Sequence, residues 1–91
     1  MTVPIPDRIL KSLHRYSTDH VPTGDFLRAV LSNDLFGAVR RADDESLKAI
    51  GEICKHVYNE LPAECWGSRE VVAKWIEQGS RNTYSNLETE P

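Results

Sequence analysis

The first residues that could bind a charged ligand surround a Pro-Thr-Gly segment. Pro22, Thr23 and Gly24 precede an apolar stretch, and the free backbone N–H groups of a helix start favour a phosphate. His20 lies in the loop that leads to this segment, which makes it a candidate ligand or interface residue. The chain has no GxxxxGK[ST] phosphate loop, and Asp25 would repel an anion. An ordinary helix start, capped by Thr23, is the simpler alternative.

Four basic residues form a second candidate site. Arg28 precedes the pair Arg40 and Arg41, and Lys48 follows it, so three successive helices would each contribute to a basic patch. The planar guanidinium group suits phosphate and carboxylate ligands. The alternative is a set of surface ion pairs with the acidic residues 43–45, worth about 0 to 1 kcal/mol each.

Two aromatic residues form a third candidate site. Trp66 stands in a short Trp-Gly-Ser segment, and Tyr58 comes near the end of the preceding apolar helix pattern. Such rings stack on nucleic-acid bases or fill a partner's pocket. A tryptophan in a short loop also covers a hydrophobic core, and this simpler interpretation stays open.

No combination of residues predicts catalysis or a metal site. The histidines His14, His20 and His56 do not form a pair at metal-binding spacing. Cys54 and Cys65 belong to no CxxC motif, so we expect free thiols, with a disulfide between them as the alternative, and Cys65 has no evident base beside it. We therefore predict a protein that is not an enzyme and needs no cofactor.

The overall composition limits the kinds of partner. The chain has 91 residues, 40% hydrophobic and 27% charged, with a formal charge of −3. This charge disfavours duplex DNA, although the break within residues 24–42 invites comparison with a helix-turn-helix; its second helix would be mostly apolar where base contacts belong. The sequence has no apolar run long enough to cross a membrane and no signal peptide, so we expect a cytoplasmic protein.

The elements that carry these candidates are predicted to be helical. Hydrophobic residues recur at helical spacing, Ser32, Asn33 and Asp34 interrupt the pattern, Pro62 ends the longest helix and Gly79 is a natural stop. We expect an all-α compact bundle of four to five short helices over residues 1–79, followed by a polar tail over residues 80–91. A chain of this size buries only about 60% of its unfolded surface, which favours a homo-oligomer. The predicted helices cover residues 6–18, 24–31, 34–42, 44–61 and 69–78.

Several blocks of the sequence resemble small proteins encoded by tailed phages and prophages. The resemblance covers roughly residues 14–78 and rests on the pattern HxPTGDFLRAVLSNDL, an Ala-Asp helix start, a Tyr-Asn pair and Pro-x-x-Cys-Trp-Gly-Ser. It implies a phage origin and carries over no catalytic residue. Small phage accessory proteins commonly bind host components stoichiometrically, and many counter host defence systems.

These observations lead to two functional hypotheses for a protein in the host bacterial cytoplasm. The first is an anti-defence protein that sequesters a host signalling nucleotide in a pocket between subunits. The alternative is a stoichiometric inhibitor that binds a host defence protein directly, through an exposed apolar and acidic surface. A structural role in the virion stays open. The ligand-binding residues predicted for the first hypothesis are His20, Thr23, Gly24, Arg28, Arg40, Arg41, Tyr58 and Trp66.

Overall fold

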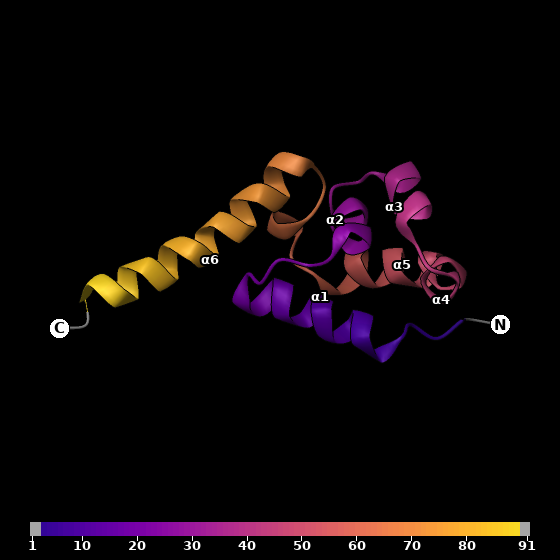
Figure 1. The fold of residues 1–91 in the computed structure, drawn as a ribbon, viewed down its shortest axis with the longest axis horizontal. Coiled ribbons are helices and arrows are strands. Elements are labelled where there is room, and N and C mark those ends of the chain that lie inside the picture. The colour runs from indigo at the N-terminus through magenta and orange to yellow at the C-terminus, as the bar shows by residue number, and fades with distance from the viewer. Residues whose placement is uncertain (1–2, 90–91) are drawn as a thin grey trace.

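The computed structural model describes the backbone of residues 3–89 and the side chains of residues 3–79. Within this range the chain is all-helical, as predicted, and contains no strand. Figure 1 shows α1 lying along one side of the globule and α6 extending away from it. The helices are α1 (Asp7–Asp19), α2 (Asp25–Leu31), α3 (Leu35–Arg41), α4 (Asp44–Lys48), α5 (Ile50–Glu60), the 3-10 helix η1 (Ala63–Cys65) and α6 (Arg69–Thr89).

Most predicted helix starts and breaks are confirmed. The backbone breaks between α2 and α3, where Asn33 adopts the left-handed conformation with φ of 62°. The Asp34 side chain then caps α3 by accepting from the Gly37 N–H at 3.0 Å. Pro62 follows the end of α5, and Ser68 Oγ accepts from the Val71 N–H at 3.2 Å at the start of α6.

The continuous helix predicted for residues 44–61 is wrong. It is divided at Ala49, which is fully buried and has φ of −96° and ψ of 3°. The Ala49 N–H reaches the carbonyl oxygens of both Glu45 and Ser46, so the last turn of α4 is tightened. Leu47 of α4 is exposed, although it belongs to the apolar pattern of the predicted helix. This division gives six α-helices in the described residues, one more than predicted.

The predicted helix stop at Gly79 is also wrong, because α6 continues to Thr89. Gly79 lies inside α6 at the point where the helix passes close to His20. A Cβ at this position would collide with the His20 side chain. The glycine therefore allows close packing of two segments and does not end the helix. The side chains of the predicted polar tail, residues 80–91, lie outside the described residues.

The core joins the first helix to the last third of the chain. Tyr16 is fully buried, and its hydroxyl donates to the carbonyl oxygen of Cys65 at 2.6 Å. Trp75 Nε1 donates to the carbonyl oxygen of Tyr16 at 2.7 Å. The buried hydrophobic cluster comprises Ile9, Leu13, Tyr16, Leu27, Leu31, Ala49, Ile53, Val57, Leu61, Cys65 and Val72.

The chain is elongated, with principal extents of 53 × 23 × 22 Å. The segment that precedes α1 and the last turn of α6 lie at opposite ends of the long axis (Figure 1). Among the described residues, no helix combines the length and the apolar character needed to cross a membrane. Association of several copies stays a prediction.

Candidate functional site

The turn between α2 and α3 positions two arginines on one side of the molecule. Leu27, Ala29 and Leu31 face the interior from α2, which leaves Arg28 exposed on the opposite side. In α3, Gly37 lies against the Asp34 carboxylate so closely that a Cβ would collide with it. The missing side chain thus permits the tight turn that brings α3 back beside α2.

Three arginines from three helices line one cavity of about 350 Å³, which we call the arginine cleft. Arg28 comes from α2, Arg41 from α3 and Arg69 from the first turn of α6. Two carboxylates, Asp25 and Asp34, also line it. The complete lining is Asp25, Arg28, Ala29, Ser32, Asp34, Arg41 and Arg69.

The charges of the arginine cleft are only partly compensated within the chain. Its three arginines and two carboxylates leave a formal charge of +1. Arg69 Nη2 lies 3.7 Å from Asp34 Oδ2, whereas Arg28 and Arg41 form no ion pair with any described residue. Arg41 Nη1 donates to the Gly37 carbonyl oxygen at 3.3 Å, and this contact leaves the other N–H donors of the Arg41 guanidinium available to a ligand. The cleft can therefore accept an anion without breaking a strong ion pair at Arg28 or Arg41.

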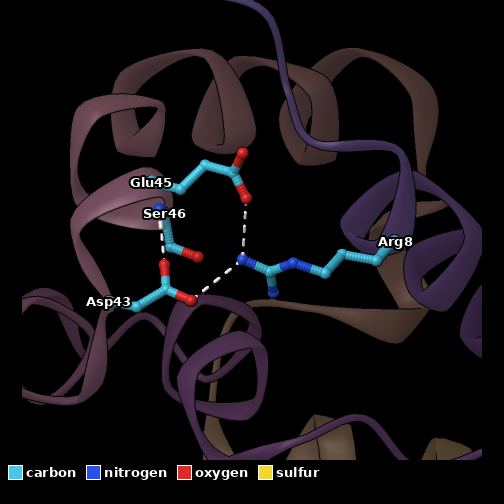
Figure 2. Close-up of polar contacts among 4 residues, drawn as sticks. All are labelled: Arg8, Asp43, Glu45 and Ser46. Carbon is cyan, nitrogen blue, oxygen red and sulfur yellow. Dashed lines mark hydrogen bonds and ion pairs between the residues drawn. The ribbon is translucent and has the colours of Figure 1, made fainter.

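A second cavity of about 300 Å³ lies beside it, and Arg41 lines both. Here Arg8 of α1 donates to the carboxylates of Asp43 at 2.9 Å and Glu45 at 3.1 Å. Figure 2 shows the guanidinium between these two carboxylates, with the Ser46 N–H directed at Asp43. The two acids neutralise Arg8 and raise its pKa. The ion pairs of Arg8 therefore hold α1 against the start of α4. They also occupy the Arg8 guanidinium, so it is not available to a ligand in this cavity.

The predicted basic patch is thus only partly formed. Arg28 and Arg41 lie together as predicted, but neither Arg40 nor Lys48 lines the arginine cleft. Arg69, which was not among the predicted residues, takes part instead. The only signal was its position directly after the cap residue Ser68, which places it at the exposed start of a helix.

The Pro-Thr-Gly segment leads into α2 as predicted, but Thr23 does not cap the helix. Gly24 is the N-cap of α2 in an extended conformation, and α2 has no side-chain cap. Thr23 Oγ1 instead donates to the Gly24 carbonyl oxygen at 3.2 Å. The predicted Thr23 cap is wrong because the helix begins one residue too late for Thr23 to reach its N–H groups. Gly24 lines the cavity beside Arg8.

His20 lies away from both cavities, at the junction of α1 and α6. It adopts a left-handed conformation with φ of 61° directly after α1, and its ring is half-buried. Its Nδ1 donates to the Trp75 carbonyl oxygen at 2.7 Å, and the two rings are 4.1 Å apart. These contacts give His20 a role in holding α6 against α1.

Tyr58 and Trp66 form a ring pair with centroids 5.8 Å apart, but neither lines the arginine cleft. Trp66 packs against the core and directs Nε1 at the Leu61 carbonyl oxygen, 3.4 Å away. Tyr58 is exposed. The simpler interpretation of Trp66, a cover for the core, thus agrees with its contacts.

The described residues offer no metal cluster and no activated thiol. No group of three or more His, Cys, Asp or Glu residues in this part of the chain is arranged to hold a metal ion. Both cysteines are free, as expected. Cys65 is buried, and burial raises the pKa of its thiol to about 11, with a smaller contribution from the charge of Glu64. A thiol in this environment is protonated at neutral pH and is a poor nucleophile.

Comparisons with known proteins found no matching family model, no related curated protein and no similar solved structure. The function must therefore be inferred from the arginine cleft and from the surfaces around it.

Proposed function

We propose that this chain is a binding protein that holds the phosphate groups of a small nucleotide in the arginine cleft. The observation that carries the proposal is the convergence of Arg28, Arg41 and Arg69, from three different helices, on one cavity of about 350 Å³. Cavities that bind small molecules have volumes of roughly 300 to 1,000 Å³, so the cleft is large enough for a phosphorylated ligand.

The chemistry of the arginines supports a phosphate ligand. Each guanidinium presents donors in a planar fork that matches two phosphate oxygens. Asp25 and Asp34 line the same cavity, but Arg28 and Arg41 form no ion pair with a described residue. The ion pair between Arg69 and Asp34 is loose, because Arg69 Nη2 lies 3.7 Å from Asp34 Oδ2. An incoming phosphate would exchange this contact for two charge-assisted hydrogen bonds to Arg69.

Recognition of the base would need aromatic contacts that lie outside the cleft of one chain. Tyr58 and Trp66 do not line it. In the arrangement predicted from the sequence, with a pocket between subunits, a second copy supplies this contact. Sequestration of a host signalling nucleotide is then the anti-defence action of a phage protein that binds without catalysing a reaction.

Isothermal titration calorimetry tests the proposal with three defined probes: inorganic pyrophosphate, a nucleoside triphosphate and a cyclic dinucleotide. We expect Arg28→Ala and Arg41→Ala each to weaken binding of at least one probe by about tenfold or more, because each removes a charge-assisted contact. Arg40→Ala is the matched control, since Arg40 is next to Arg41 on the same helix and does not line the cleft. Equal affinity in Arg28→Ala, Arg41→Ala and the unaltered protein would exclude this cleft as the site.

A further inference from the structure

Helix α3 presents an apolar surface that no described part of the chain covers. Phe36 is 89% exposed, Leu35 57% and Val39 42%. These residues are one, three and four positions apart, so they share one side of the helix, which we call the α3 face. Ala38 is the only buried residue of α3.

This surface is unusual for a folded chain. The apolar spacing of Leu35, Phe36 and Val39 predicts burial. A phenylalanine ring this exposed gains none of the favourable free energy that burial away from water would provide. Isolated exposed apolar residues are common, but three adjacent ones with a central aromatic ring are typical of an interaction site. The residue types of the α3 face are therefore those of a protein-binding surface.

The charges around the α3 face indicate what it contacts. Arg40 is exposed, forms no ion pair with a described residue and follows Phe36 by four positions, so it borders the face. The residues of α3, LFGAVRR, include no acid. Of the carboxylates that flank α3 in the sequence, that of Asp34 contacts the Gly37 N–H and Arg69, and that of Asp43 contacts Arg8. The surface of α3 is thus apolar and basic.

A second copy of this chain fits the face poorly. Two α3 faces packed on each other would bury on the order of 300 Å² per copy, against about 800 Å² per partner in a stable interface. Such a pairing would also leave both Arg40 side chains without an acid on the facing α3 helix. A small convex surface with one protruding aromatic ring is better matched by a concave pocket.

We propose that the α3 face docks into an apolar pocket of a different protein, and that this pocket is bordered by Asp or Glu side chains. Phe36 fills the pocket, Leu35 and Val39 pack against its walls, and Arg40 pairs with a carboxylate at its edge. This docking is independent of the arginine cleft, because none of the four residues lines that cleft. Failure of one proposal therefore leaves the other intact.

Photo-crosslinking in the full chain tests the docking. Phe36→p-benzoylphenylalanine is expressed in the cells that naturally produce the protein, and irradiated products are mapped by mass spectrometry. Tyr58→p-benzoylphenylalanine is the matched control, because Tyr58 is also an exposed aromatic residue but lies on α5. We expect position 36, and not position 58, to crosslink to a different protein at an apolar segment that contains Asp or Glu.

The crosslinked partner is then purified and its affinity measured. We expect Phe36→Ala to weaken binding about 30-fold or more, as for a central aromatic anchor. Arg40→Glu should weaken binding at least tenfold and Arg40→Lys much less, while circular dichroism shows an unchanged fold. Crosslinks only between copies of the chain, crosslinks to no protein, or a partner indifferent to Arg40→Glu would each overturn the proposal.

Discussion

The imidazole of His20 lies 4.1 Å from the indole of Trp75, and its Nδ1 donates to the carbonyl oxygen of the same residue at 2.7 Å. Gly79 follows Trp75 by one helical turn and brings its backbone against the His20 side chain. One residue at the end of α1 therefore contacts α6 on two successive turns. This contact explains why a glycine is retained inside a helix.

Substitution of that glycine should destabilise the protein. We expect Gly79→Ala to lower the free energy of unfolding by about 1 to 3 kcal/mol, because the added Cβ forces His20 and α6 apart. The control is Gly51→Ala, since a Cβ on Gly51 of α5 meets no atom within 4 Å. The control should be neutral or stabilise by up to about 1 kcal/mol, as alanine favours helices. Urea unfolding followed by circular dichroism measures both; equal stability of Gly79→Ala and the unaltered protein would contradict the contact.

The hydroxyl of Tyr16 provides a second stability prediction. Tyr16→Phe removes the buried hydrogen bond to the Cys65 carbonyl oxygen and leaves that oxygen without its donor. We expect a loss of about 1 to 3 kcal/mol in the free energy of unfolding, the usual effect of leaving a buried polar group unsatisfied. Tyr58→Phe removes the same hydroxyl from an exposed ring and should change the value by less than about 0.5 kcal/mol. A comparable loss in both variants would argue against a specific role for the buried bond.

The cap of α4 should make stability depend on pH in the acid range. The Ser46 N–H holds the pKa of Asp43 below its ordinary value of 3.8, with help from Arg8. Because the folded pKa is lowered, this stabilisation is present above about pH 3.8 and is lost as pH falls through the folded value. Asp43→Asn keeps a capping oxygen but cannot ionise, so its midpoint of urea unfolding should depend less on pH between 2 and 5. Identical pH profiles for the two proteins would exclude Asp43 as a contributor.

The two cysteines should differ in reactivity. Cys54 is exposed, whereas Cys65 is buried and its pKa is raised to about 11. At pH 8, iodoacetamide should modify Cys54 first and leave Cys65 unmodified until the protein unfolds, as peptide mapping will show. A raised pKa also means that the stabilisation from the neutral thiol is complete below pH 9.0 and is lost as pH rises towards 11. Modification of both thiols at one rate in the folded protein would contradict this placement.

The sequence predicted those features that depend on local chemistry. Proline at residue 62 marks the end of α5, and the cap-forming residues 32–34 mark the break between α2 and α3, because each acts on its own backbone. Of the basic patch suggested by the sequence, Arg28 and Arg41 do lie together, and a short break that folds two consecutive helices against each other accounts for this.

Features that depend on distant parts of the chain could not be predicted. Helical periodicity identifies an apolar side but does not show whether another element covers it, so it cannot reveal that Phe36 and Leu47 are exposed. Glycine is a typical residue at the end of a helix, and the close approach of His20 explains why Gly79 lies inside α6 instead. Arg69 reaches the arginine cleft through the fold; its position after the cap residue Ser68 indicates an exposed helix start, but not that Arg28 and Arg41 lie beside it.

The hydrogen bonds that join α1 to η1 and α6 also have a consequence for the kinetics of folding. Tyr16 contacts Cys65 across 49 residues, His20 contacts Trp75 across 55, and Trp75 contacts Tyr16 across 59. Each of these contacts forms only after a loop of that length has closed, and the entropy of closure is lost before any of the bonds is gained. The α2–α3 hairpin, by contrast, needs only local closure. Docking of α1 is therefore expected to be the late, rate-limiting event as the chain folds, even though α1 is synthesised first.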